Sequence, residues 1–275
     1  MVIVILNWNG KHLLEQFLPS VVRYSSGVGL YVIDNASTDG SVLFLQEHYP
    51  QIKIVQNAEN YGYAKGYNEG LKHIPADVYC LINSDVEVTP HWLEAPMHIF
   101  AHEPQVSILQ PKIKSYKQKN YFEYAGAAGG YIDKYGFPYC RGRVFDTIEE
   151  DIGQYEEQTP IFWASGACFF IKASVFEHLG GFDEDFFAHQ EEIDLCWRAQ
   201  NEGYKVYYTP LSQIYHLGGA TLEQGSTQKV FLNFRNSLFM LLKNLPKGAW
   251  FSTIFLRMVL DGIAGIRFFF QGKPS

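Results

Sequence analysis

The amino-acid sequence predicts an α/β fold: a mostly parallel central sheet with flanking helices, followed by a C-terminal helical extension. Three observations lead to this prediction. Short apolar runs alternate with helical stretches over the first ninety residues. Each of these runs is bounded by polar or turn residues, as a buried strand is. From residue 228 onward the pattern becomes helical and very apolar.

The first ninety residues contain the regular part of the pattern. We expect buried strands at residues 2–6, 30–33, 52–55 and 78–82. Between these runs, crossover helices fit residues 11–22, 41–48 and 64–73. A repeated strand–helix–strand order predicts a parallel sheet with helices on both faces. The first run follows Met1 without a basic segment, so we expect a strand there and not a signal peptide.

The pattern becomes less regular after residue 104. Residues 105–160 are rich in glycine, tyrosine and acidic residues, which indicates irregular strands and an excursion over one face. After this segment we expect a strand at 161–172, a short helix at 175–179, a helix from 191 that ends at Gly203, and a strand at 205–208.

Composition limits the classes of function. Hydrophobic residues make up 47% of the 275 residues and charged residues 19%, as in a globular protein. Residues 229–275 hold seven Lys or Arg against Asp261 alone, about +6, which leaves about −13 on residues 1–228 when subtracted from the total of −7. An acidic body argues against nucleic-acid binding. Four cysteines without paired spacing indicate reduced thiols in a cytoplasmic protein.

Polar side chains follow each of the four predicted strands. In open parallel sheets, ligands bind beyond the carboxyl ends of the strands. The residues expected there are Asn7-Trp8-Asn9, Asp34-Asn35, Asn57 and Asn83-Ser84-Asp85, which outline one site. Asp34 lies before the cap of the next helix and is well placed to accept a hydrogen bond from a base or ribose.

No glycine-rich phosphate fingerprint is present in the sequence. A nucleotide could instead be held by a divalent cation that bridges diphosphate oxygens to a carboxylate. Asp85, directly after a buried strand, suits this role, although an aspartate here could also simply start a turn. His216 is a candidate additional ligand to metal or diphosphate, because Gly218-Gly219 could let backbone approach a phosphate. A lone histidine is otherwise most often structural.

Two adjacent carboxylates, Glu191 and Glu192, open a predicted helix. One interpretation is a plain cap, since negative charge suits a helix N-terminus. The other is a general base, whose pKa the helix N-terminus would lower, so that it stays ionised at neutral pH. Asp194 is a further acid of this helix, for which the alternative is an i,i+4 pair with Arg198.

Several motifs resemble those of family 2 glycosyltransferases, which are inverting enzymes of the A-type fold, and especially their bacterial rhamnosyltransferase-like branch. They occur in the family's order over residues 2 to 240. The segments that carry the resemblance are residues 4–10, 32–41, 60–70, 81–86, 165–167, 180–184 and 191–198.

The resemblance implies roles for these positions. Asn7, Trp8, Asn9 and Asp34 would line the nucleotide pocket, and we count Asn68 and Asn83 among its nucleotide-binding residues. Asp85 would be the metal-binding acid of a D-x-D-type motif, with Mg²⁺ or Mn²⁺ as cofactor. Glu192, the second acid of its pair, would be the catalytic base beside Glu191. This chain departs from the pattern in carrying Asn83 and Glu192 where relatives usually have aspartate, and Tyr67 where many have an arginine that contacts the base.

The implied reaction moves a sugar from a nucleoside-diphosphate sugar to a saccharide or lipid-linked acceptor in bacterial surface polysaccharide synthesis. The acceptor should enter beside Trp163 and Gly166, with Asp194 as a third acceptor-binding candidate, although Trp163 could equally be a core aromatic. Two alternatives remain open, a sugar-nucleotide nucleotidyltransferase and a non-catalytic sugar-nucleotide-binding module.

These expectations divide the chain into a catalytic domain at 1–228 and an apolar, basic extension at 229–275. The domain has a nucleotide-binding half at 1–104 and an acceptor and catalytic half at 105–228. The extension either packs on protein, as on the catalytic domain or in a homodimer, or lies in the inner surface of the cell membrane. The protein is expected to be cytoplasmic, with peripheral membrane contact in the second case.

Overall fold

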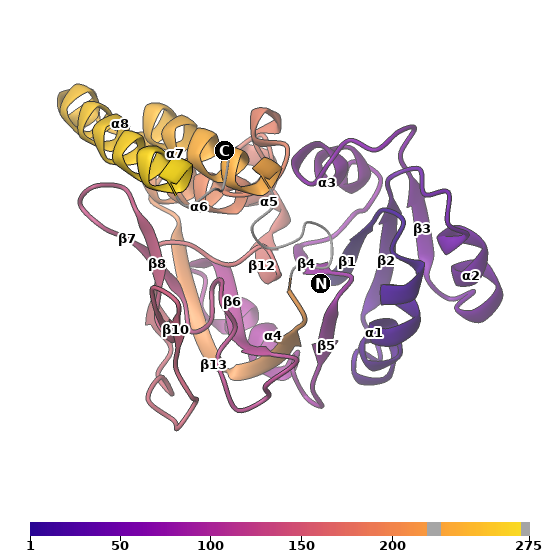
Figure 1. Cartoon of the computed structure of the whole chain (residues 1–275). Coiled ribbons are helices and arrows are strands. Elements are labelled where there is room, and N and C mark those ends of the chain that lie inside the picture. The colour runs from indigo at the N-terminus through magenta and orange to yellow at the C-terminus, as the bar shows by residue number, and fades with distance from the viewer. Residues whose placement is uncertain (219–226, 271–275) are drawn as a thin grey trace.

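A computed structural model describes residues 1–218 and 227–270, and a nine-stranded sheet forms its centre (Figure 1). Eight of these strands are ordered β11-β13-β6-β12-β4-β1-β2-β3, and β5 pairs with β13. The strands are β1 (Val2–Asn7), β2 (Gly29–Asp34), β3 (Lys53–Gln56), β4 (Val78–Asn83), β5 (Val86–Val88), β6 (Val106–Ser115), β11 (Thr159–Pro160), β12 (Cys168–Lys172) and β13 (Lys205–His216). Two small sheets pair β7 (Gly130–Ile132) with β8 (Pro138–Cys140), and β9 (Arg143–Val144) with β10 (Thr147–Ile148).

Helices cover both faces of the sheet, and successive strand residues point to opposite faces. Ile3 and Ile5 join one core, while Val2 and Val4 join the other. The first core contains side chains of α1 (Lys11–Tyr24), α2 (Ser41–His48) and α4 (Glu94–His102). The second contains side chains of α3 (Ala64–Leu71), α5 (Ala173–His178) and α6 (Glu191–Asn201). The predicted α/β class is therefore confirmed.

The direction of the strands changes across the sheet. β3, β2, β1 and β4 are parallel, as the strand–helix repeat predicts. β12 is antiparallel to both β4 and β6. It starts at the carboxyl end of β4, where Cys168 pairs with Ile82, and so has to run back along the sheet. The sheet is thus parallel in its N-terminal half and mixed beyond β4.

The segment expected to be irregular contributes a long central strand, β6. Its apolar pattern is interrupted because it buries polar side chains, among them Gln110 and Lys112. The Lys112 ammonium lies 3.3 Å from Asp151, which also pairs with Lys114 at 3.0 Å. Asp151 belongs to the acidic run at residues 146–157, so this run neutralises lysines of β6.

Two helices complete the described chain, α7 (Thr227–Asn244) and α8 (Lys247–Phe270). They lie side by side in Figure 1, at the upper left of the view. α7 packs on α6 and on the short 3₁₀ helix η1 (Glu184–Phe186). The expected helical character of residues 229–275 is therefore observed as far as Phe270, and α7 adjoins the helix that carries the Glu191-Glu192 pair.

Candidate active site

A buried amide and a carboxylate tie the ends of β1 and β2 together. Asn7 donates from Nδ2 to Asp34 Oδ2 at 2.9 Å and to Ser37 Oγ at 3.1 Å. The backbone N–H of Ser37 donates to Asp34 Oδ1 at 2.8 Å. A Cβ on Gly10 would lie 2.6 Å from Asn7 Oδ1, so the close approach here requires glycine. Hydrogen bonds thus fix the side chains of Asn7 and Asp34 at this edge of the sheet.

The next residues of this edge are more accessible. Trp8 is 47% exposed directly after Asn7, so its indole face is available to a planar ligand. Asn9 adopts a left-handed conformation with φ of 48°, and its Oδ1 accepts a hydrogen bond from the backbone N–H of Thr38 at 2.8 Å. Hydrogen bonds from side chains therefore join the segment after β1 to the segment after β2, so this part of the site is preorganised for a ligand.

Asp85 and His216 meet because strand pairing places them side by side. The turn after β4 leads into β5, whose first residue, Val86, pairs with His216. Asp85 Oδ1 lies 3.2 Å from His216 Nε2, and Glu123 Oε1 lies 3.4 Å from the other ring nitrogen, Nδ1. Asp85 and Glu123 are buried. Glu123 was not among the predicted site residues, because it falls in the segment expected to be irregular.

Asp85 and His216 shift each other's pKa, and Glu123 adds to the shift of His216. Burial would raise the pKa of Asp85, but the charge and hydrogen bond of His216 lower it below its ordinary value. Burial would likewise lower the pKa of His216, but Asp85 and then Glu123 raise it to about 10. The result is an imidazolium held between two carboxylates.

This donor set fits a divalent cation once His216 has lost its Nε2 proton, because only the neutral imidazole has a nitrogen lone pair to give. A carboxylate oxygen and an imidazole nitrogen are ligands that Mn²⁺ accepts, and Glu123 is placed to orient the imidazole through Nδ1, as metal-bound histidines usually require. Within residues 1–218 and 227–270, no cluster of three or more His, Cys, Asp or Glu side chains could hold a metal ion. Asp85 and His216 would therefore share the cation with oxygens of a ligand and with water.

Glu191 and Glu192 begin α6, but burial has a larger effect on their pKa values than the helix N-terminus has. Burial raises the pKa of Glu192 to about 7, although the backbone N–H groups of Glu192 and Gln190 act in the opposite direction. The helix N-terminus thus acts in the expected direction, but the expectation that the pKa of Glu192 is lowered overall is wrong. Glu191 is 4% exposed, and burial, with the charge of Glu192, raises its pKa well above the ordinary value. The raised pKa of Glu191 favours its protonated form, whereas Glu192, with a pKa of about 7, can both lose and accept a proton at neutral pH.

Glu192 lies against the small-residue turn that precedes β12. A Cβ on Gly166 would be 3.7 Å from the carboxyl carbon of Glu192 and 3.3 Å from the hydroxyl of Tyr63. The Tyr63 hydroxyl donates to the Gly166 carbonyl at 2.9 Å. The backbone N–H of Asn83, at the end of β4, donates to the neighbouring Ala167 carbonyl at 3.0 Å. Gly166 therefore leaves room beside Glu192 at the edge where β4 ends.

Two predicted acceptor residues belong to the framework of the site. Asp194 is fully buried, and its carboxylate accepts hydrogen bonds from Arg198 Nε and Asn244 Nδ2, both at 2.7 Å. Trp163 is 4% exposed, and its Nε1 donates to the Tyr131 carbonyl at 2.8 Å. Neither side chain offers a surface to an acceptor. The geometry supports the alternatives, an i,i+4 pair with Arg198 and a core aromatic.

Asn68 and Tyr67 also have structural partners. The Asn68 amide donates to the Phe182 carbonyl at 2.8 Å and accepts from the Phe182 N–H at 2.9 Å, so it holds the turn before η1. Tyr67 is fully buried, with its hydroxyl 3.4 Å from the Val4 carbonyl and 3.3 Å from that of Ile82. Tyr67 therefore packs between strands and does not take the place of a base-contacting arginine.

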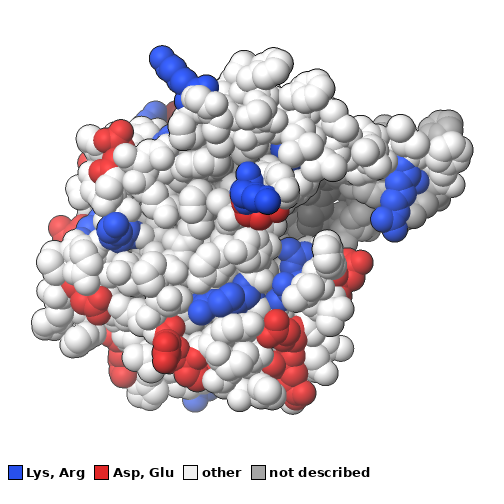
Figure 2. Space-filling model, turned by 90° about the vertical axis from the view of Figure 1, so that its left-hand side faces the viewer, with Lys and Arg blue, Asp and Glu red and all other residues white. Residues whose placement is uncertain are grey.

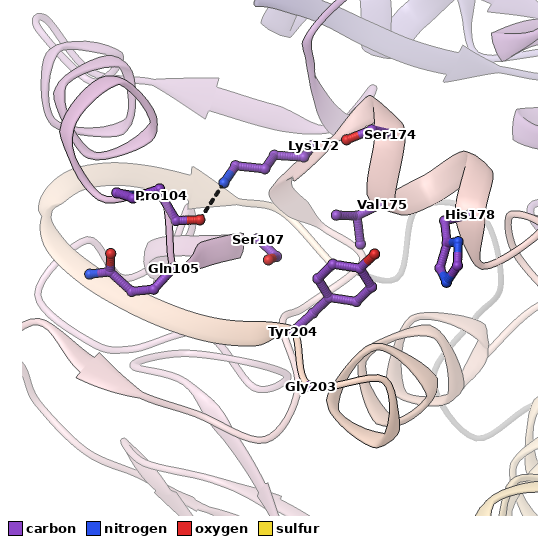
Figure 3. A pocket seen from close by; sticks show the side chains of 9 residues that line it. All are labelled: Pro104, Gln105, Ser107, Lys172, Ser174, Val175, His178, Gly203 and Tyr204. Carbon is purple, nitrogen blue, oxygen red and sulfur yellow. Dashed lines mark hydrogen bonds between the residues drawn. The ribbon is translucent and has the colours of Figure 1, made fainter.

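A cavity of about 460 Å³ lies away from these residues (Figure 3). Lys172 pairs with Val78, the first residue of β4, so this cavity is at the opposite edge of the sheet from Asp85. The Lys172 ammonium donates to the Pro104 carbonyl at 2.7 Å across it. Its lining residues are Pro104, Gln105, Ser107, Lys172, Ser174, Val175, His178, Gly203 and Tyr204.

The parallel half-sheet, the mixed second half and the acids gathered at one edge define an A-type glycosyltransferase fold. Residues 2–180 match the family described as Glycosyl transferase family 2, and the chain belongs to this family. The chain is therefore a glycosyltransferase, which sets aside the nucleotidyltransferase. Glu191 and Glu192 lie beyond the matched residues.

A curated relative extends the similarity over most of the chain. It is the N-acetylglucosaminyl-diphospho-decaprenol L-rhamnosyltransferase of Mycobacterium tuberculosis, 23% identical over 273 residues, which cover 94% of this chain and 88% of the relative.

Two solved structures share the fold. GalNAc-T7 with UDP, GalNAc and Mn²⁺ has a TM-score of 0.66 at 17% identity, over 87% of this chain and 47% of that one, so this chain spans about half its length. The mannosyltransferase PcManGT from Pyrobaculum calidifontis, with GDP-Man and Mn²⁺, has a TM-score of 0.58 at 15% identity, over 96% and 75%.

Proposed function

We propose that this glycosyltransferase transfers a sugar, with inversion at C1, from a nucleoside-diphosphate sugar to a hydroxyl of a saccharide or lipid-linked acceptor in surface polysaccharide synthesis. The observation that carries the proposal is the position and ionisation of Glu192. Its carboxyl group lies against Gly166 at the edge of the sheet where β4 ends, and its pKa is about 7. A base with a pKa near the operating pH is the most effective kind.

In the proposed reaction, Glu192 accepts the proton of the acceptor hydroxyl as that oxygen forms a bond to C1 of the sugar. The bond from C1 to the diphosphate oxygen breaks on the opposite side, and its electron pair leaves with the nucleoside diphosphate. The raised pKa of Glu191 disfavours a second negative charge beside this step. Tyr63 holds the Gly166 turn, which keeps space for the acceptor oxygen next to the carboxylate.

Asp85 and His216 are the proposed ligands of a divalent cation, Mg²⁺ or Mn²⁺, with Glu123 orienting the imidazole. The cation would stabilise the negative charge that grows on the departing diphosphate. Since an imidazole nitrogen is a better ligand for Mn²⁺ than for Mg²⁺, the donor set favours Mn²⁺. Asn7, Trp8, Asn9, Asp34 and Asn83 surround the place where the nucleotide would lie.

The proposed acceptor is linked to a lipid. The name of the mycobacterial relative places its acceptor sugar on diphospho-decaprenol. In this chain, the exposed surface of α8 supports activity at the surface of a bilayer. The segment Lys247–Arg267 is long and apolar enough to cross a membrane by length and composition. Exposed apolar side chains along α8 are Trp250, Phe251, Phe255, Leu256, Met258, Val259, Leu260, Ile263, Ile266 and Phe270.

One side of α8 is fixed to protein, so we propose that the helix lies in the membrane surface and does not cross it. Arg257 is 2% exposed, donates from Nη1 to the Gly136 carbonyl at 2.8 Å and from Nη2 to Ser237 Oγ at 2.7 Å, and lies over the Phe137 ring. Asp261, the single acid of residues 229–275, faces Arg257 at 3.6 Å.

The charge around α8 supports a bilayer with anionic headgroups as the proposed partner. Lys247 and Arg267 stand near the two ends of the helix, and the apolar face between them carries no acid. An amphipathic helix of this kind binds with its apolar face at the acyl boundary and its basic residues at the headgroups. Figure 2 turns the left-hand side of Figure 1, where α8 lies at the top, toward the viewer. The upper part of the surface in this view is mainly uncharged. A second copy of the chain is the competing partner for the same face.

A donor panel tests the proposed activity. The full chain is incubated with nucleoside-diphosphate sugars, among them rhamnose donors, with Mn²⁺ or Mg²⁺, and release of nucleoside diphosphate is measured with and without lipid-linked saccharides. We expect release from one donor class that depends on the cation and is accelerated by acceptor. A family member without transferase activity would release nothing from any donor, which would overturn the proposal.

A further inference from the structure

The segment that leads into α6 has an unusual backbone. Phe187, His189 and Gln190 have φ of 61°, 72° and 71°, the left-handed region, and none of them is glycine. Each such residue raises the energy of its local conformation, so that it persists only where surrounding structure enforces it. Glu191 and Glu192 follow Gln190 directly, so the position of both carboxylates depends on what enforces this conformation.

The enforcing contacts come from α7, far along the chain. Asn236 is fully buried, and its Nδ2 lies 3.0, 2.8 and 2.7 Å from the carbonyl oxygens of Phe186, Ala188 and His189. Two N–H bonds therefore serve three carbonyl groups of the strained segment. Gln190 adds a bond in the other direction, from its Nε2 to the Asn233 carbonyl at 2.9 Å.

Arg235 fixes the orientation of the Asn236 amide. Its Nε donates to Asn236 Oδ1 at 2.9 Å, which turns the amide nitrogen toward the segment. Its Nη2 also donates to the carbonyl oxygens of Asp185 and Phe186, both at 3.1 Å. The two neighbouring residues of α7 thus bind the carbonyl groups of Asp185, Phe186, Ala188 and His189.

The opposite side of the segment contacts the turn before α3. The backbone N–H of Tyr63 donates to the Phe187 carbonyl at 3.0 Å. Gly62 lies so close that an added Cβ would be 2.8 Å from the Phe187 ring. Tyr63 in turn holds Gly166, beside which Glu192 lies. The strained segment is therefore clamped between α7 and the part of the chain that bounds the space next to Glu192.

We infer that Asn236 is a positioning residue for the reaction: by binding the carbonyl groups of residues 186, 188 and 189 it sets the start of α6, and with it the place of the Glu192 carboxylate. The inference rests on the proposed role of Glu192 as the base. It makes α7 a part of the catalytic site, although no side chain of α7 has to touch the substrate.

Asn236→Asp is the main test, because it keeps the size of the side chain and removes both N–H donors. We expect kcat to fall by about tenfold to a hundredfold, while the donor KM changes less than about twofold. The midpoint of the acid limb of kcat/KM should also move away from that of the unaltered protein, because the surroundings of Glu192 change. Arg235→Gln should give the same pattern more weakly, and it serves if the first variant does not fold.

Ser237→Ala is the matched control. Ser237 neighbours Asn236 on α7 and is also buried, but its hydroxyl accepts from Arg257 and contacts no carbonyl of the segment. Ser237→Ala should lower the melting temperature, but it should change neither kcat nor the midpoint of the acid limb of kcat/KM. Suppose that Asn236→Asp and Arg235→Gln both fold and lose stability, but have the same kcat and the same acid-limb midpoint as Ser237→Ala. The positioning role of Asn236 is then refuted. If Glu192→Gln itself keeps full turnover, the proposed base fails instead, which separates the two conclusions.

Discussion

At the scale of single residues, the two adjacent carboxylates of α6 differ because their surroundings differ. Burial raises the pKa of both, and that of Glu192 reaches about 7. An acid whose pKa is raised on folding binds its proton more tightly in the folded state. The stability from this effect is complete below the unfolded pKa near 4.5 and is lost as the pH rises to about 7. Ionising Glu192 therefore costs about 1–2 kcal/mol, allowing for its partial exposure.

Asp85→Asn tests the proposed cation site at the same scale. We expect the affinity for nucleoside diphosphate in Mn²⁺ to fall at least about tenfold, since a neutral amide is a weaker ligand than a carboxylate, while affinity in chelator stays unchanged. Titration calorimetry measures both values. Glu69→Gln, which removes an acid of α3 outside the site, is the control. If the unaltered protein binds nucleoside diphosphate with equal affinity with and without Mn²⁺, Asp85 is not a ligand of the cation.

Several site residues could be predicted because they follow strand ends, where position alone carries information. Asn7, Asp34 and Asp85 do lie at one edge of the sheet. The pairing of His216 with Asp85 could only be suggested, because it depends on β5 and β13 meeting across more than a hundred residues. Glu123, Tyr63 and Asn236 had no local signal, since each acts through a partner distant in sequence.

At the scale of elements, the sequence pattern was most informative where apolar runs are continuous. The first four strands and three helices were expected close to their observed bounds. β6 was not recognised, because Gln110 and Lys112 interrupt its pattern and are neutralised or bonded only in the folded protein. A helix N-terminus was expected to control Glu192, but desolvation, which sequence cannot show, is the larger effect.

Trp163→Phe tests whether the strand-like segment before β12 is framework or acceptor surface. The substitution keeps an aromatic ring and removes the bond from Nε1 to the Tyr131 carbonyl. We expect a loss of about 1–3 kcal/mol in the free energy of unfolding, from a partly buried carbonyl left without its donor. The acceptor KM should change less than about twofold. Trp250→Phe, at an exposed position of α8, should leave stability nearly unchanged. A large rise in acceptor KM without loss of stability would restore Trp163 as an acceptor residue.

At the scale of the whole molecule, the acidic body and the basic C-terminal segment have different surroundings in the fold. The C-terminal part of the chain contains α7, which binds the carbonyl groups of the segment before α6, and α8, which has an exposed apolar face. The expected extension thus contains two helices with different surroundings. If α8 rests on a bilayer, the site would be held near an acceptor that is confined to the same surface.

Phe251→Asp combined with Ile263→Asp tests the membrane proposal, because both side chains lie on the exposed face of α8. The unaltered chain should sediment with liposomes that contain anionic lipid at low salt, and the double variant should stay in solution with donor turnover intact. Leu211→Asp, at an exposed apolar position on β13, is the control and should sediment normally. If the unaltered chain does not sediment but forms dimers that the double variant loses, the face is an interface between copies.

The pH dependence of kcat/KM for the unaltered protein and for Glu192→Gln tests the central claim most directly. The account predicts an acid limb with a midpoint near 7 for the unaltered protein, because Glu192 has to be ionised to accept the proton. Glu192→Gln should lower kcat/KM by about a hundredfold or more and abolish that limb, with donor affinity nearly unchanged. A variant that keeps both its rate and the limb would show that another group is the base, and the assignment of the site to Glu192 would be wrong.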